Sequence, residues 1–64
     1  MDVYNFCCFA TDDSIVIQIW DQNTEQIVFT GSFREAMYSD YESYDVDSFD
    51  LDDGQMILNI DTSY

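Results

Sequence analysis

Hydrophobic and polar residues alternate along several short segments of the chain, which is the pattern of half-buried β-strands. The clearest case is the segment 14–20, in which Ile15, Ile17 and Ile19 share one face. We expect this isoleucine face to lie in the core. The segment 3–9 is rich in aromatic and β-branched residues, which favour strands, so it is also predicted to be a strand.

A third strand is predicted over residues 26–30, with Ile27 and Phe29 on one face. Polar turns at 10–13 and 21–25 separate the three segments. Connections this short join antiparallel neighbours, so the first half of the chain is predicted to be a three-stranded meander.

The alternation stops at Gly31, and a helix start follows. Ser32 and Glu35 have the spacing of a capping box, in which each side chain accepts from the other residue's backbone N–H. This predicts a short helix from about Phe33 to Asp40. One apolar stripe runs along it and beyond it, formed by Phe33, Ala36, Met37 and Tyr41.

The second half of the chain is predicted to be a hairpin around Asp53 and Gly54. This dipeptide favours a type I′ turn, which needs positive φ at both central residues. Apolar residues alternate after the turn, at Met56, Leu58 and Ile60.

The segment before the turn changes phase. Tyr44 and Val46 share one parity, whereas Phe49 and Leu51 share the other. A β-bulge near residues 47–48 would turn all four side chains inward, because it adds one residue to the strand. The same bulge would aim four acids outward: Asp45, Asp47, Asp50 and Asp52.

These elements predict one α+β domain over residues 1–64, in the order β-β-β-α-β-β. We expect an antiparallel sheet of four or five strands with one short helix packed on one face. A domain of this length buries only about 60% of its unfolded surface and is marginally stable. The sequence leaves open whether a homodimer adds to that stability.

Charge changes this picture more than any other property. The 64 residues include 14 acids and one Arg, with no Lys or His, for a formal net charge of −13. A high net charge indicates disorder only when hydrophobicity is low. Here 47% of residues are hydrophobic and 17% are aromatic. The composition therefore predicts a folded domain with an acidic surface.

Adjacent cysteines, Cys7 and Cys8, do not suit a disulfide with one another, and two ligands are too few for a metal site. We expect small apolar strand residues, one facing the core and one facing away. Free thiols, the absence of a signal peptide and the absence of a membrane-length apolar run favour a cytoplasmic protein.

No cofactor or catalytic motif is present, so we expect a non-enzymatic protein. An EF-hand would need side-chain ligands at positions 1 and 3 of a loop with Gly54 at position 6, and Phe49 and Leu51 stand there instead. A non-standard cation site on the acids stays open. The negative charge also argues against direct binding of nucleic acid or anionic membranes.

Half of the residues from 40 to 53 are acidic, and tyrosines stand among them. Such side chains would bind a basic protein, with the tyrosines as anchors. The candidate partner-binding residues are Asp40, Tyr41, Glu42, Tyr44, Asp45, Asp47, Asp50, Asp52 and Asp53.

The spacing of carboxylates along one face of a strand roughly resembles the spacing of phosphates along a nucleic-acid backbone. Both groups also bind arginine in a bidentate manner. In size and composition the chain resembles the small acidic DNA mimics of phages and mobile elements. That resemblance implies an anti-restriction or anti-CRISPR inhibitor acting in the host cytoplasm. Its partner would be a nuclease, CRISPR effector, polymerase or nucleoid protein.

Two other interpretations remain open from the sequence. One is an acidic interaction module, similar to an antitoxin or immunity protein, that neutralises a basic partner without mimicking nucleic acid. Its contacts would include the side of the sheet that carries Trp20. The other is a solvated acidic surface with no role in binding.

Overall fold

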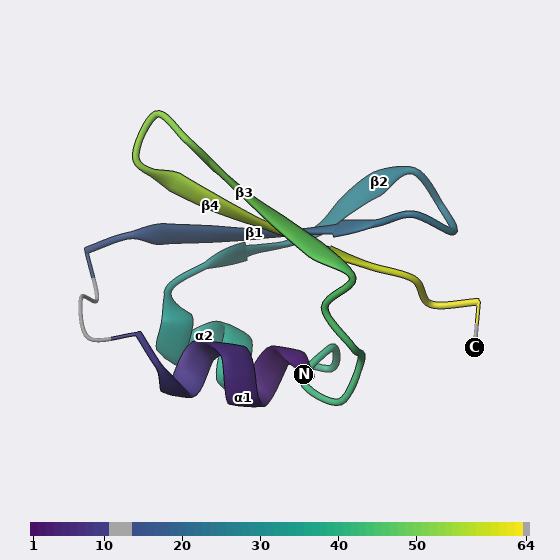
Figure 1. Cartoon of the computed structure of the whole chain (residues 1–64), viewed down its shortest axis with the longest axis horizontal. Coiled ribbons are helices and arrows are strands. Elements are labelled where there is room, and N and C mark those ends of the chain that lie inside the picture. The colour runs from purple at the N-terminus through teal and green to yellow at the C-terminus, as the bar shows by residue number, and fades with distance from the viewer. Residues whose placement is uncertain (11–13, 64) are drawn as a thin grey trace.

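A four-stranded sheet with two short helices across one face makes up the computed structural model, which describes residues 1–10 and 14–63 (Figure 1). The α+β class, the four strands and the packing of a helix on the sheet agree with the sequence prediction. The turn predicted at 10–13 lies mostly outside the described residues. In chain order the elements are α1 (Val3–Cys8), β1 (Val16–Asp21), β2 (Gln26–Gly31), α2 (Phe33–Met37), β3 (Ser48–Asp52) and β4 (Gln55–Ile60).

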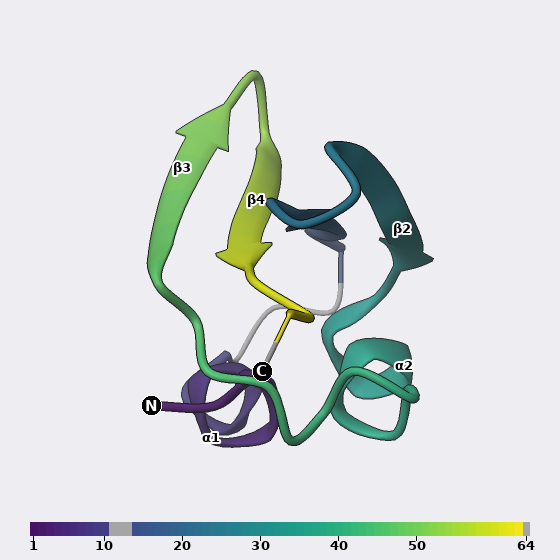
Figure 2. The ribbon, with the colours of Figure 1, turned by 90° about the vertical axis from the view of Figure 1, so that its right-hand side faces the viewer.

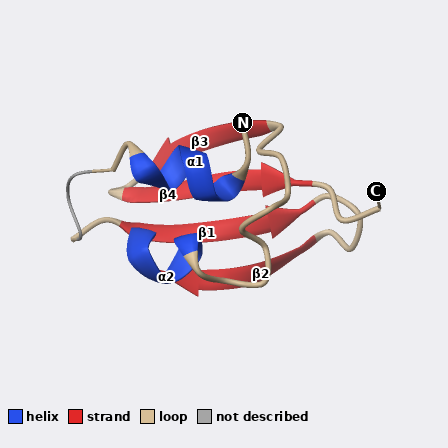
Figure 3. Ribbon diagram, turned by 90° about the horizontal axis from the view of Figure 1, so that it is seen from below, coloured by secondary structure: helices blue, strands red, loops and turns tan. Residues whose placement is uncertain are grey.

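The sheet is mixed, whereas a purely antiparallel sheet was predicted. Its strand order is β2-β1-β4-β3, with β1 parallel to β4 and each of these antiparallel to its outer neighbour (Figure 3). Burial explains the order, because β1 and β4 are the most apolar strands and take the two central positions. Their fully buried apolar side chains are Ile17, Ile19, Leu58 and Ile60.

The segment 3–9 forms helix α1, so the predicted first strand is wrong and the order is α-β-β-α-β-β. Asp2 caps this helix by accepting from the backbone N–H of Asn5 at 2.8 Å. The segment's β-favouring residues also have helical periodicity, and packing on the sheet selects the helix. The side chains that contact the core are Val3, Phe6, Cys7 and Ala10.

The capping box of α2 is confirmed. The Ser32 hydroxyl accepts from the Glu35 N–H, and the Glu35 carboxylate accepts from the Ser32 N–H, both at 3.2 Å. The helix ends at Met37, before the predicted end at Asp40, because Tyr38 leaves helical geometry (φ −113°, ψ 14°).

A bulge in the pairing of β1 with β2 changes which side chains share a face. Ile19 pairs with Phe29, but Trp20 pairs with Ile27, so β2 has one extra residue, Val28. Ile19 and Trp20 point to opposite faces of the sheet. Ile27 and Phe29 therefore also lie on opposite faces, which corrects the prediction that they share one.

The hairpin turn is the predicted type I′, with positive φ at Asp53 (51°) and Gly54 (79°). At the other end of the hairpin, Asn59 pairs with Ser48, and its carbonyl also accepts from the N–H of Asp47 at 2.8 Å. Two consecutive residues thus oppose one, which is the arrangement that the predicted bulge requires.

Strand β3 is exposed along its whole length, although its apolar residues were expected to be buried. Phe49 and Leu51 lie on the side of the helices, but they remain 56% and 66% exposed. The tip of the hairpin extends away from both helices (Figure 2), and Leu51 lies next to that tip in β3. Tyr44 and Val46, which precede the strand, do pack against the core.

Cys7 and Cys8 differ sharply in environment, as predicted, although both lie in helix α1 and not in a strand. Cys7 is buried and Cys8 is exposed. Burial, together with the neighbouring Cys8, raises the pKa of Cys7 to about 11. The Cys7 thiol is therefore both shielded and protonated at neutral pH.

We expect iodoacetamide to alkylate only Cys8 in the native protein at pH 7.5, and both cysteines in denaturant. Peptide mass spectrometry distinguishes the two sites if the Cys7→Ala and Cys8→Ala variants are run beside the wild type. Rapid native labelling of the Cys8→Ala variant would contradict the burial of Cys7.

Candidate protein-binding surface

The loop between α2 and β3 carries much of the predicted acidic surface, and the start of α1 holds it in place. The first N–H groups of a helix have no partner within the helix. Here the N–H of Val3 donates to the Tyr44 carbonyl and that of Tyr4 donates to the Glu42 carbonyl, both at 3.0 Å. The loop backbone is thus fixed by α1, while its acidic side chains remain exposed.

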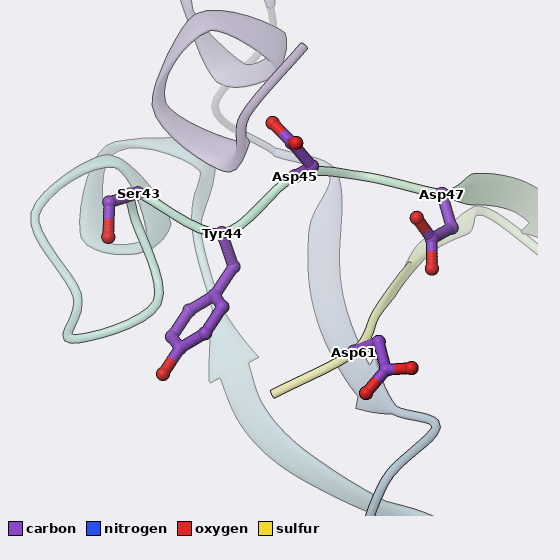
Figure 4. A pocket seen from close by; sticks show the side chains of 5 residues that line it. All are labelled: Ser43, Tyr44, Asp45, Asp47 and Asp61. Carbon is purple, nitrogen blue, oxygen red and sulfur yellow. The ribbon is translucent and has the colours of Figure 1, made fainter. Parts of the chain in front are cut away.

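Part of this loop lines a pocket of about 580 Å³, the acidic pocket, together with the residue that follows β4 (Figure 4). Hydrogen bonds orient two of its carboxylates. Gln22 donates to Asp47 through its side-chain amide at 3.1 Å, and the N–H and hydroxyl of Ser63 donate to Asp61 at 2.9 and 2.6 Å. The pocket-lining residues are Ser43, Tyr44, Asp45, Asp47 and Asp61.

The predicted acids form separate groups and not one row. Asp45 and Asp47 line the acidic pocket. Asp50 and Asp52 pair with β4 residues whose side chains point away from the helices, so they project from the other face of the sheet. The remaining three are exposed, Asp53 at the hairpin tip, and Asp40 and Glu42 in the turns after α2.

The two tyrosines proposed as anchors contribute to the fold as well as to the surface. Tyr41 and Tyr44 are half-buried and pack against the core. Their ring centroids lie 6.2 Å apart with an interplanar angle of 37°. Replacing either ring would therefore weaken the packing of the core as well as change the surface.

Sequence reasoning missed Asp61, although the hairpin register contained the signal. Pairing Asp52 with Gln55 across the turn brings residue 46 opposite residue 61, and the extra residue of the predicted bulge shifts this partner to Asp45. Counting along the predicted hairpin would have placed Asp61 opposite Asp45. The sequence could therefore have predicted the third carboxylate of the acidic pocket.

A buried carboxylate close to Asp61 was also missed. Asp21 is 2% exposed and ends β1. It accepts from the Thr62 hydroxyl at 2.6 Å and N–H at 3.1 Å, from the Thr24 hydroxyl at 3.1 Å and from the Asn23 N–H at 3.0 Å. This network ties the β1–β2 loop to the segment after β4, next to the acidic pocket.

The hydrogen bonds to Asp21 also set its protonation. Burial alone raises the pKa of Asp21, but the bonds from Thr62, Asn23 and Thr24 outweigh that effect and lower the pKa below its usual range. Asp21 is therefore a buried anion at neutral pH, and its role is structural because its oxygens are occupied by these donors.

Within the described part of the chain, no group of three or more Cys, Asp or Glu side chains is arranged to hold a metal ion. No helix there is long and apolar enough to cross a bilayer. The exposed side chains of the described residues include the carboxylates of the 40–53 segment and apolar groups such as Phe49 and Leu51.

The chain matches no protein-family model, no curated protein and no solved structure.

Proposed function

We propose that this protein is a non-enzymatic acidic inhibitor that mimics a phosphate backbone and blocks the basic groove of a DNA- or RNA-binding protein. Restriction nucleases, CRISPR effectors, polymerases and nucleoid proteins are the target classes, and a phage or mobile element is the source that the composition favours. The observation that carries the proposal is a net charge of −13 on a folded domain whose densest acidic segment is held by backbone hydrogen bonds.

The spacing of the carboxylates supports this proposal. Asp50 and Asp52 project from one face of β3, and residues two apart on a strand are about 6.6 Å apart. A single DNA strand carries one phosphate per roughly 3.4 Å of helix axis, so the match is coarse. Arginine side chains bind carboxylates and phosphates in the same bidentate manner, which lets a groove built for phosphate accept these acids.

Preorganisation is the second support. The acidic loop already has its backbone hydrogen bonds, and Asp47 and Asp61 are already oriented by Gln22 and Ser63. Little conformational entropy is then lost when the loop meets a partner. A long-range negative field would also raise the association rate with any basic groove.

An acidic interaction module is the second candidate function, because phosphate mimicry does not require apolar side chains. Phe49 and Leu51 are more than half exposed and adjoin the acids of β3. Exposed apolar residues among charges are typical of protein-binding surfaces. A basic partner unrelated to nucleic acid would use both features, and competition with DNA separates this function from mimicry.

The proposal predicts that a target from a panel of purified nucleases, CRISPR effectors, polymerases and nucleoid proteins will be inhibited through the 40–53 segment. The variant Asp45→Asn, Asp50→Asn, Asp52→Asn should bind that target at least about tenfold more weakly, mainly through a slower association rate. Surface plasmon resonance at several salt concentrations measures the affinity and the association rate. The affinity of the variant should depend less steeply on salt than that of the wild type.

A matched control removes the same charge elsewhere, with Asp12→Asn, Asp13→Asn and Glu25→Gln. This control should keep an affinity close to that of the wild type. Equal losses from the two triple variants would mean that net charge alone, and not the 40–53 segment, drives binding.

A further inference from the structure

Strand β3 is an edge strand with one free side. The sheet order puts β4 on its inner side, and no other strand in the described part of the chain pairs with it. It pairs with β4 from Ser48 to Asp52 without a shift in register. An unpaired edge with a regular register is a template for a further strand.

The register shows which backbone groups face outward. Asp52 and Gln55 flank the two-residue turn and form the first hydrogen-bonded pair of the hairpin. Because hydrogen-bonded and non-hydrogen-bonded pairs alternate in an antiparallel ladder, Phe49 and Leu51 turn their N–H and C=O groups away from β4. These groups are the ones available to an added strand.

The two faces of β3 differ in chemistry. On the helix side, Phe49 lies beside Phe6 of α1, with ring centroids 5.3 Å apart. A groove of about 410 Å³ opens there beside the strand. Its lining residues are Met1, Phe6, Val46, Asp47, Ser48 and Phe49. On the other side of the sheet, Asp50 and Asp52 present carboxylates.

We propose that β3 binds an extended peptide segment of a partner by antiparallel strand addition, and that this segment alternates basic and apolar residues. Its apolar side chains lie beside Phe49 and Leu51 over the groove, and its basic side chains lie beside Asp50 and Asp52 on the other face. Main-chain hydrogen bonds to the free edge supply the affinity, and the alternation supplies the specificity.

Charge decides between this occupant and a second copy of the chain. In a self-paired antiparallel edge, the acids of β3 would face acids of the other copy, and each copy carries a net charge of −13. Like charges directly opposite one another destabilise a strand pair, whereas opposite charges stabilise it. The edge thus disfavours its own copy and favours a basic strand.

The other edge of the sheet, β2, lacks these features. Its pairing with β1 contains the bulge at Val28, which twists the strand locally. It carries no acidic residue between Gln26 and Gly31. Strand β3 is therefore the edge suited to a basic strand, and β2 serves as an internal control.

This inference goes beyond phosphate mimicry, and its test needs neither nucleic acid nor a nucleic-acid-binding protein. The probe is a capped synthetic heptapeptide of alternating lysine and valine, titrated into the full chain. Binding is followed by calorimetry, and amide exchange is followed residue by residue by NMR. We expect exchange at Phe49 and Leu51 to slow by at least about tenfold on saturation, with no change along β2.

Two N-methylated peptides of equal charge test the hydrogen bonds. Valines opposite Phe49 and Leu51 must donate to the free edge, whereas the lysine N–H groups point away from it. N-methylation of the valines should weaken binding at least about tenfold, and N-methylation of the lysines should leave it nearly unchanged. The double variant Asp50→Asn, Asp52→Asn, which alters only exposed side chains, should also bind the parent peptide more weakly.

Equal binding of the two methylated peptides, or protection of amides outside β3, would overturn the inference. Protection of Phe49 and Leu51 without peptide, in a protein that sediments as a dimer, would overturn it in favour of a second copy. Because the assay contains no target protein, such a failure would leave the proposed inhibition of a nucleic-acid-binding protein standing.

Discussion

Replacing Asp21 with asparagine is expected to lower the melting temperature by roughly 5–15 °C. The carboxylate accepts four hydrogen bonds at the point where the β1–β2 loop meets the segment after β4. An asparagine amide cannot accept all of them, and it places a donor against the donors of Thr24 or Thr62. Differential scanning fluorimetry measures the change.

Asp61→Asn is the matched control. It also removes one carboxylate charge, from the residue that precedes Thr62, a hydrogen-bond donor to Asp21. Asp61 is partly exposed and its bonds from Ser63 are local, so we expect a much smaller loss. Equal melting temperatures for wild type and the Asp21→Asn variant would show that the network does not stabilise the fold.

The pH dependence of the Asp21 effect follows from its lowered pKa. A carboxyl group whose pKa is lower in the folded state contributes stability above its unfolded pKa, which is about 4 for Asp. The difference in melting temperature between wild type and Asp21→Asn should therefore be complete at neutral pH. It should shrink as the pH falls below about 4, through the folded pKa. A difference that stays constant down to pH 2 would contradict the assigned direction.

The second large effect is expected from salt. With a net charge of −13, repulsion within the domain opposes folding, and salt screens it. Raising NaCl from about 20 to about 200 mM should raise the melting temperature by roughly 3–10 °C. The triple variant at Asp45, Asp50 and Asp52 should start from a higher melting temperature and gain less from salt.

The control for this salt effect is the uncharged osmolyte sucrose at matched osmolarity, which does not screen charge. It should give a smaller shift than NaCl gives. A melting temperature that is flat or falls with NaCl would mean that the carboxylates do not repel one another appreciably in the folded domain.

Local signals in the sequence predicted the elements whose geometry depends on neighbouring residues. The reciprocal bonds of Ser32 and Glu35 and the positive φ values of Asp53 and Gly54 are set within four consecutive residues. The capping box and the type I′ turn can be predicted from sequence, because few residue types suit those conformations. The change of phase before Phe49 likewise predicted the two-to-one pairing opposite Asn59.

Features that depend on tertiary packing were not predictable in the same way. The first segment suits either a strand or a helix, and its place beneath the sheet decides for α1. The parallel pairing of β1 with β4 joins residues that are far apart in sequence, and only the burial of both central strands selects it. The exposure of Leu51 depends on how far the helices reach, which no local pattern encodes.

The acidic surface was predicted in composition but not in arrangement. Alternation placed Asp50 and Asp52 on one face, as strand geometry requires. Asp45 and Asp47, in contrast, belong to a loop that α1 fixes, and α1 was predicted to be a strand. Their meeting with Asp61 in the acidic pocket follows from the hairpin register and from the bulge that precedes β3.

Phosphate mimicry is tested most directly by competition between this protein and duplex DNA for an inhibited target. A fixed amount of target is titrated with the protein at increasing concentrations of DNA that the target binds, at constant ionic strength. If the protein occupies the nucleic-acid groove, its apparent Kd should rise in proportion to the DNA concentration, and saturating DNA should release it completely. A ternary complex, or an apparent Kd that is unchanged at saturating DNA, would contradict mimicry.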